Sequence, residues 1–394
     1  MPKPLPSGAH LDHLKKQAKS LLKTGRQAET EAIRRFQSHH PEYATGVPKP
    51  DKLKLQEAQL VVAREYDFPS WPQLVAATKE SKTDSPDTSG ILILTNGESA
   101  VETLKRANIP GHKEEWLEVL HDGPVPFTET RTELNRIRAK HIASLGWSSE
   151  EGAYNRFQKR DALLKQHDKY QEMQLWFEHD LYDQLQLIQI LDTLAERQEW
   201  NGNVKLVQTS RFITELSAEE LKRESENPIS IAEKHISLAQ QAWSAFRQPK
   251  TDQIKRLVES DLSTLPHLKP ALKRVLQENP DEHTGLGRTE RQILEAVVSG
   301  ADKLGPVFRH SQQQEEAAFM GDLSFVAIID RLTQGKAPPL KAEGVSRLLE
   351  NADPLKFETI RERRLQITDT GHSILSGNIR YQTPPYWLGG TQIT

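Results

Sequence analysis

Three short polar clusters of this sequence carry the residue types that acid–base chemistry and ligand binding require. The strongest is Glu178-His179-Asp180, which directly follows the apolar run 173–177. Carboxylates and imidazoles can donate or accept protons, and both can bind metal ions. Asp180 could equally cap a helix that begins at Leu181, so a structural role stays open for it.

The second cluster is the segment 121–126, which reads His-Asp-Gly-Pro-Val-Pro. A glycine and two prolines so close together predict a rigid, sharply turned loop. His121 could act as a general acid or base, and Asp122 could orient it, although adjacent residues point in different directions. The alternative is a plain turn, in which Asp122 bonds to its own backbone and His121 is a packed surface ring.

The third cluster is Asn96-Gly97-Glu98-Ser99, which follows the apolar run 91–94. Gly97 permits a close approach to the backbone, and the start of the next helix would favour an anion. The segment matches neither a Walker phosphate loop nor the G-x-G-x-x-G pattern. An ordinary strand-to-helix turn is an equal alternative.

The order of apolar runs and amphipathic segments indicates how these clusters are positioned. Strands are expected at 91–94, 116–120, 173–177 and 204–208, and helices at 100–107, 135–145, 154–167 and 181–197, with a loop at 223–228. Strands that alternate with helices predict a parallel sheet. We therefore predict an α/β fold, with a three-layer, Rossmann-like, mostly parallel sheet. Ligands of such sheets bind at the carboxyl ends of the strands, where the three clusters fall.

The strand ends define the predicted site. Its predicted catalytic residues are His121, Asp122, Glu178, His179 and Asp180. Its predicted ligand-binding residues are Asn96, Gly97, Glu98, Ser99, Gly123, Trp176 and Asp183, although Trp176 fits packing better than stacking on a base. A divalent metal is a possible cofactor. Its ligands would be Glu178 and His179 with His121 or Asp122, but no H-x-H, H-E-x-x-H or D-x-D spacing supports it.

Helical regions flank the α/β region. Before it, helices are expected at 11–22, 28–36, 55–66 and 71–78, and residues 1–50 carry a net charge of +5. After it, helices are expected at 254–260, 267–277, 305–319 and 323–333, with a helix at 289 capped by Thr289 and Gln292. Strands at Leu340 and 365–367 and a helix from 368 complete the outline of a winged helix. A Trp before two glycines, at 387–390, suggests a tail that folds back. The predicted domains are 1–80, a linker at 81–90, 91–245 and 246–394.

Composition excludes several classes of protein. The chain has 394 residues and no cysteine, which excludes a disulfide scaffold, an iron–sulfur cluster and a thiol nucleophile. Lys and Arg (52) nearly balance Asp and Glu (55), and 36% of residues are hydrophobic, so the chain is polar but not disordered in composition. No stretch approaches the about 20 apolar residues of a membrane span, and the first residues do not resemble a signal peptide. We expect a cytoplasmic protein.

Several blocks resemble a bacterial family catalogued as domain of unknown function 1835. They are Asn96-Gly97-Glu98-Ser99-Ala100, 121–126 and 175–184, with 285–291, Gly321-Asp322 and 387–390 similar to the family's companion C-terminal region. Glu98 stands where the family usually has Asp. Ala58-Gln59 and the segment 63–71 resemble parts of a small helical module found in various bacterial proteins, including some ankyrin-repeat proteins. The resemblance implies a bacterial cytosolic protein and no particular activity.

Three functions remain open from the sequence. The first is an enzyme, such as a hydrolase or transferase, or a ligand-binding protein that takes a phosphorylated or nucleotide-like ligand at the strand ends. The second is a ligand-responsive regulator that binds DNA through the winged helix, but the expected recognition helix 323–333 offers only Arg331 to phosphates. The third is an adaptor that docks through the basic N-terminal helices.

Overall fold

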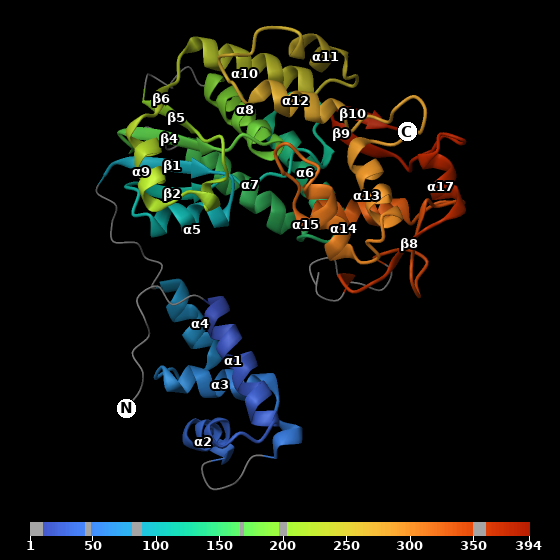
Figure 1. The fold of residues 1–394 in the computed structure, drawn as a ribbon. Coiled ribbons are helices and arrows are strands. Elements are labelled where there is room, and N and C mark those ends of the chain that lie inside the picture. Colours follow the sequence, from blue (N-terminus) through green and yellow to red (C-terminus); the bar gives the residue numbers. More distant parts are fainter. Residues whose placement is uncertain (1–10, 44–48, 81–88, 166–168, 197–202, 350–359) are drawn as a thin grey trace. The chain divides into compact units, whose positions relative to one another are not determined.

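Figure 1 shows the fold in a computed structural model, which describes residues 11–43, 49–80, 89–165, 169–196, 203–349 and 360–394. The chain forms two compact units, residues 1–88 and 89–394. The boundary between them falls in the predicted linker 81–90, of which residues 81–88 lie outside the described residues.

The first unit is helical, as the sequence predicts. Its elements are α1 Leu11–Arg26, α2 Thr30–His39, η1 Pro41–Tyr43, η2 Pro50–Lys52, α3 Leu55–Glu65 and α4 Trp71–Glu80. Their apolar faces meet in one core around Phe36, Leu53 and Val61. The buried carboxylate of Glu65 accepts two hydrogen bonds from Arg35, at 2.6 and 2.9 Å, and so holds α2 against α3.

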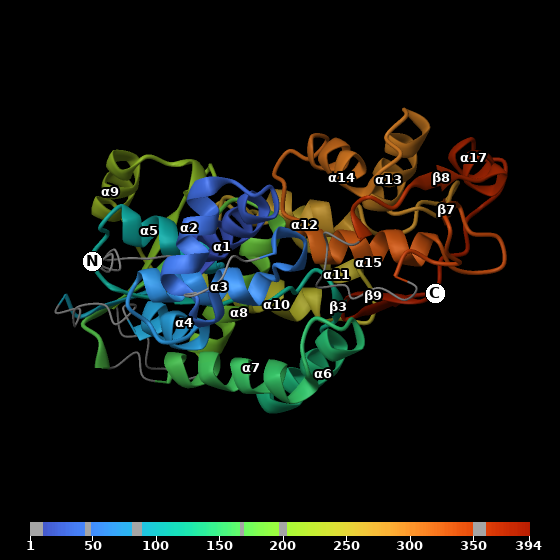
Figure 2. The same cartoon turned by 90° about the horizontal axis from the view of Figure 1, so that it is seen from below.

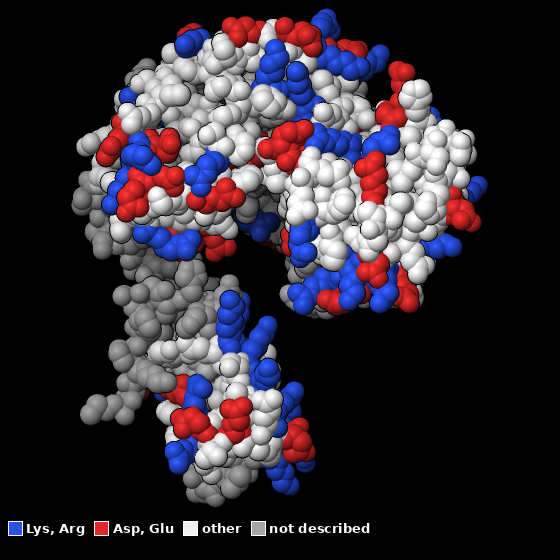
Figure 3. Space-filling view, in the orientation of Figure 1, with Lys and Arg blue, Asp and Glu red and all other residues white. Residues whose placement is uncertain are grey.

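Positive charge in this unit is concentrated on the surface of one helix. α1 exposes Lys16, Lys19 and Lys23, whose spacing places them along one side. Figure 3 shows Lys and Arg side chains gathered along one edge of the unit.

A five-stranded sheet organises the first half of the second unit. The strand order is β2-β1-β4-β5-β6, and all neighbours are parallel except β5 and β6. The strands are β1 Ile91–Thr95, β2 His112–Glu115, β4 Glu172–Phe177, β5 Val204–Gln208 and β6 Ile229–Ser230. The predicted mixed α/β fold with a mostly parallel sheet is confirmed. Because β2 and β4 lie on opposite sides of β1, the strand order reverses there, and in open α/β sheets such a reversal is where ligands bind.

Helices cover both faces of the sheet because its strands are apolar on both sides. Leu94 and Leu175 face a core that includes α8, whereas Ile93 and Trp176 face α5, η4 and α9. Figure 1 shows α10, α11 and α12 beyond α8, and contacts of α10 and α12 with α8 bury that helix on nearly every side. The helices are α5 Glu98–Arg106, α8 Leu181–Ala195, η4 Ile213–Glu215, α9 Ala218–Glu226, α10 Glu233–Phe246, α11 Asp252–Val258 and α12 Leu268–Leu276.

A helical hairpin lies between β2 and β4 in sequence. It consists of α6 Arg131–Ser144 and α7 Glu150–Leu164, which pack on each other (Figure 2). Thr130 and Ser149 cap the two helices through their side-chain oxygens.

The second half of the unit contains three helices followed by short strand pairs. Its elements are α13 Arg288–Val298, α14 Leu304–Gln312, α15 Asp322–Leu332, β7 Leu340–Ala342, β8 Leu365–Ile367, α17 Asp369–Leu375, β9 Tyr386–Gly389 and β10 Thr391–Ile393. β9 also pairs in parallel with β3, Gly123–Pro124, so the tail folds back onto the α/β half. One hydrophobic core runs through both halves and across the predicted boundary at 245, which falls within α10.

Four local predictions are wrong. Segment 116–120 is a loop, and the strand is the preceding polar segment 112–115, whose sheet-edge position needs no alternating apolar pattern. Residues 223–226 belong to α9, and α14 ends at Gln312 rather than at 319. α13 begins two residues earlier than expected, with Gly287 rather than Thr289 as its N-cap, and the Gly287 amide donates to Glu290 (3.1 Å), so Glu290 and not Gln292 is the capping partner.

The ends of the helices predicted to reach 167 and 197 lie outside the described residues. Among the residues that the structure does describe, none of the helices has both the length and the apolar character of a membrane span.

Candidate functional site

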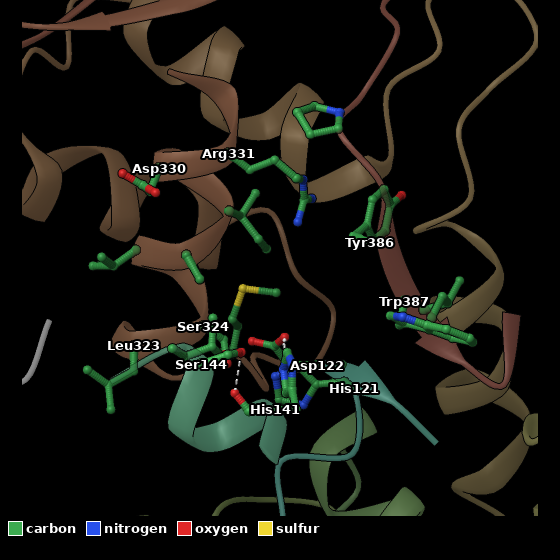
Figure 4. Close-up of a pocket in the computed structure, with 18 of the residues that line it drawn as sticks. His121, Asp122, His141, Ser144, Leu323, Ser324, Asp330, Arg331, Tyr386 and Trp387 are labelled. Carbon is green, nitrogen blue, oxygen red and sulfur yellow. Dashed lines mark hydrogen bonds and ion pairs between the residues drawn. The ribbon is translucent and has the colours of Figure 1, made fainter. Parts of the chain in front are cut away.

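A cavity of about 390 Å³ lies between the two halves of the second unit. Its walls are the loop 121–123, the end of α6, the turn 319–320, α15 and the segment 384–388 (Figure 4). The volume falls within the range of sites that enclose small ligands. Polar side chains line the cavity at the loop 121–123 with the end of α6, and again at Arg331 on α15. Apolar side chains of α15 lie between these two polar groups.

An aspartate–histidine pair lies on the first wall. Asp122 Oδ1 is 3.1 Å from His141 Nε2. Neighbouring groups hold the pKa of Asp122 below its usual value: burial opposes ionisation, but the hydrogen bond from His141 and nearby positive charge outweigh it. A carboxylate accepts only, so Nε2 carries the proton and Nδ1 is left for other chemistry.

Gly123 lets His141 approach the loop. Its φ angle is +81°, a backbone conformation that favours glycine. A Cβ atom at this position would lie 2.1 Å from Cδ2 of His141. The glycine predicted to bind ligand therefore makes room for the imidazole beside Asp122.

A buried ionic cluster holds the same loop in place. Arg138, on α6, donates to Glu118 Oε1 at 3.0 Å and to the carbonyl oxygens of Asp122 (2.6 Å) and Val119 (2.7 Å). Arg160, on α7, donates to the other oxygen of Glu118 at 2.5 Å. Despite burial, the charges of Arg160 and Arg138 lower the pKa of Glu118. The side chains of all three residues are at most 4% exposed.

His121 is on the same wall but is not paired with Asp122. Both of its ring nitrogens are buried and have no hydrogen-bond partner among the described residues. Its ring packs edge-on against two aromatic neighbours, Phe319 at 5.1 Å and Tyr182 at 5.9 Å between centroids. Burial lowers the pKa of His121 to about 4, so the ring is neutral near pH 7 and offers one donor and one acceptor.

The opposite wall carries Arg331, on α15. Its Nη2 atom donates to the buried carboxylate of Glu290 at 3.0 Å, and its guanidinium lies 4.1 Å from the ring centroid of Tyr386, on β9. Figure 4 shows the guanidinium extending from α15 toward Tyr386, across the cavity from His121 and Asp122.

A second group of predicted residues lies at the ends of β1 and β4. The amide nitrogen of Asn96 donates to Glu178 at 3.0 Å and to Asp183 at 2.8 Å. Asp183 accepts from the amide of Glu178 (2.5 Å), and Asp180 caps α8 by accepting from the amide of Asp183 (3.1 Å). Tyr182 connects this group to the cavity, since its hydroxyl donates to the carbonyl of Asn96 (3.2 Å).

The three carboxylates of this group could hold a divalent cation. Glu178, Asp180 and Asp183 have oxygen atoms within 4.8 Å of one another, and no other such cluster occurs in the part of the chain that the structure describes. Oxygen ligands favour Mg²⁺, Ca²⁺ or Mn²⁺. Neither His121 nor His179 belongs to the cluster, unlike in the predicted metal site. Hydrogen bonds within the cluster account for its geometry as a helix cap.

Asp180 makes stability dependent on pH. Burial, followed by the charge of Glu178, raises the pKa of Asp180 to about 7. A raised pKa stabilises the fold at low pH, and this contribution is lost as the pH rises from about 4 to 7. Asp180→Asn keeps a good N-cap and removes the charge. We expect the variant to exceed wild type in free energy of unfolding by about 1–3 kcal/mol at pH 8, with a smaller gap at pH 5.

Urea unfolding at pH 5, 6, 7 and 8 measures this difference. The control is Asp252→Asn, an exposed aspartate in the first turn of α11, which should retain the wild-type slope of stability against pH. An Asp180→Asn variant with the same slope as wild type would show that this carboxyl is ionised in the folded protein.

The structure thus divides the predicted residues into three sets. His121, Asp122 and Gly123 line the cavity, and Asn96, Glu178, Asp180 and Asp183 form the acidic cluster. The others belong to neither: Gly97, Glu98, Ser99, Trp176 and His179. Trp176 is fully buried and donates to Gln174 (2.9 Å), and His179 packs against Phe212 and His267.

Sequence reasoning missed His141, Arg331 and Tyr386 as site residues. His141 occurs in a predicted amphipathic helix, and no motif marks it. Arg331 was considered only as a contact to DNA phosphates, although the structure buries most of it against Glu290. Tyr386 comes to the cavity through the pairing of β9 with β3, which only a contact between distant segments could reveal.

No family model matches the chain, and none of the curated proteins matches it.

Proposed function

We propose that the protein is an enzyme that binds a small ligand in the cavity beside His121 and transfers a proton through the Asp122–His141 pair. The state of His121 carries this proposal, because two buried ring nitrogens without partners are costly unless a ligand or water satisfies them. The phosphorylated or nucleotide-like ligand expected from the sequence remains the proposed class, and hydrolysis or group transfer the proposed reaction.

The roles of the side chains follow from their bonds. Asp122 holds Nε2–H of His141, so Nδ1 can take a proton from the ligand and return it. His121 is neutral and can donate one hydrogen bond to the ligand and accept another. Arg138 acts as a positioning residue, since it binds the backbone of the loop and touches no part of the cavity.

Two histidine variants distinguish the cavity, which His121 lines, from the surroundings of His179, which lies outside it. Wild-type protein is first screened by thermal shift and calorimetry against a panel of nucleotides and sugar phosphates. A ligand found in this way should lose at least about tenfold in affinity in His121→Ala, because the loss of one or two buried hydrogen bonds weakens binding by about 1.5–3 kcal/mol. His179→Ala is the matched control and should bind like wild type, since His179 lies outside the cavity. Weaker binding in His179→Ala, with normal binding in His121→Ala, would move the site out of the cavity to the surroundings of His179.

A regulator with a winged helix is the second candidate. The order α13, α14, α15, β7, β8 and a bridge between Lys303 and Arg364 favour this fold. Two observations oppose DNA binding: α15 lines the cavity, and Arg331 is paired with Glu290. Figure 3 also shows acidic and basic side chains interspersed on the visible face of the second unit. Binding of a DNA duplex that weakens steeply with salt would favour the regulator.

A further inference from the structure

We infer that Arg331 binds an anionic group of the ligand, so that the substrate is an organic anion whose acidic end lies against α15 and β9. The inference rests on the proposed function, because it concerns the ligand of the same cavity. It assigns the second wall a role that neither the acid–base pair nor His121 can supply.

The first argument is the incomplete pairing of Arg331. Its Nη2 atom donates to Glu290, but its Nε atom is buried and has no hydrogen-bond partner among the described residues. An unpaired N–H of a buried cation is costly. A carboxylate or phosphate oxygen would satisfy it with a charge-assisted hydrogen bond.

The second argument is a comparison with the other arginine of the cavity wall. Arg347 directs Nε (3.2 Å) and Nη2 toward the two carboxylate oxygens of Asp330, so its fork is occupied. Arg331 has no such two-point partner in what the structure describes. Of the two guanidinium groups, Arg331 is the one whose Nε–H is buried without a partner among the described residues.

The third argument is that Arg331 is held in place before any ligand arrives. Glu290 fixes one edge of the guanidinium, and Glu290 is itself fixed by the amide of Gly287 at 3.1 Å. The ring of Tyr386 lies 4.1 Å from the guanidinium and restricts the orientation of its plane. A cation held in this way loses little entropy when it binds an anion.

The fourth argument is the distribution of charge across the cavity. Asp122, on the opposite wall, would repel an anion, whereas the neutral ring of His121 would not. Glu278 and Asp330 also line the cavity, but each is paired with an arginine, Arg274 and Arg347 respectively. A ligand with an acidic end and an uncharged polar end should therefore bind in one orientation. Its acidic end faces Arg331, and its uncharged end faces His121 and His141 (Figure 4).

Calorimetry with paired probes tests the inference on the full chain. The probes are AMP, adenosine, inorganic phosphate and citrate, which separate a phosphate from a carboxylate and a charged from an uncharged ligand. We expect at least one anionic probe to bind, and AMP to bind at least about tenfold more tightly than adenosine if the group is a phosphate. Arg331→Met should abolish this preference. Arg331→Lys, which keeps the charge but not the fork, should bind the anion more weakly than wild type.

Controls keep loss of folding apart from loss of binding. Arg347→Met removes the occupied arginine and should retain anion binding. Arg331→Met leaves the buried carboxylate of Glu290 without its partner. The double variant Glu290→Gln/Arg331→Met removes both charges of the pair, and far-UV circular dichroism checks that it is folded. Failure of every anionic probe to bind wild type overturns the inference. So does equal binding by wild type and the folded double variant.

The outcome for the proposed function is separate. A probe, charged or not, whose binding is lost in His121→Ala but kept in Arg331→Met would uphold the cavity as the site and refute the anion contact alone. A probe that binds equally well to both variants would place its site elsewhere and refute both.

Discussion

Glu118→Gln is expected to lower the free energy of unfolding of the second unit by about 3–5 kcal/mol. The carboxylate of Glu118 is 1% exposed and is shared by Arg138 and Arg160. The side-chain amide of Gln has the same shape as the carboxylate but carries no charge. Its NH₂ group would face an arginine N–H group and could not accept a hydrogen bond from it. The variant therefore leaves two buried guanidinium groups without their common counter-ion. Because Arg138 also holds the carbonyls of Val119 and Asp122, the loop of the cavity should loosen with it.

Urea unfolding followed by tryptophan fluorescence at pH 7 measures this loss. The matched control is Glu362→Gln, which breaks an exposed pair with Lys303 and should leave the stability close to that of wild type. The pKa of Glu118 is lowered in the folded protein, so the stability that its charge contributes is lost as the pH falls and the carboxylate becomes protonated. The free energies of unfolding of wild type and Glu118→Gln should therefore converge in acid. Equal stability of Glu118→Gln and Glu362→Gln at pH 7 would mean that the buried cluster contributes no more than a surface pair.

Gly390→Ala is expected to be as damaging and to act on the opposite wall. A Cβ atom at position 390 would lie 1.9 Å from the carbonyl oxygen of Arg247, which is backbone and cannot rotate away. The amide of Gly390 also donates to the carbonyl of Phe246 at 2.9 Å. The substitution must push the β9–β10 turn off the end of α10, and we expect a loss of at least about 3 kcal/mol, as for other severe overpacking.

Gly305→Ala is the control for this substitution. Gly305 lies in α14 with nothing near its missing side chain, so alanine there should be neutral or slightly stabilising. Thermal unfolding compares the two variants. A wild-type melting temperature for Gly390→Ala would show that the turn can move away from α10 at little cost, and that β9 is a loosely held wall.

Much of the fold can be predicted from the sequence because its strands are short apolar runs. The runs 91–94, 173–177 and 204–208 became β1, β4 and β5 with boundaries shifted by one residue or less. β2 escaped prediction because an edge strand of the sequence His-Lys-Glu-Glu has no apolar pattern. β3 and β9 could not be predicted because each is stabilised by pairing with the other, and no local property of Gly123 or Leu388 indicates that pairing.

In the candidate site too, the residues marked by local sequence could be predicted, and those that depend on contacts between distant segments could not. His121 and Asp122 were found because a turn rich in glycine and proline follows them, and the acidic cluster was found because it ends the most apolar strand. His141 was not found, since a histidine within a polar helix has the same local pattern whether or not it faces an aspartate. The role of Glu118 could not be predicted either, because its burial depends on a loop and two helices, α6 and α7, that meet only in the folded chain.

The pairing of β3 with β9 has a kinetic consequence. The sheet and α8 can assemble from segments that are moderately close in sequence, but the cavity requires Gly123 to meet Leu388. Contacts between such distant segments form slowly, because a long loop must close before they contribute any stability. A folding chain can therefore complete its sheet while it still lacks the cavity. Any ligand held between the two walls would retard their separation, and its dissociation would then report on the opening of the protein as a whole.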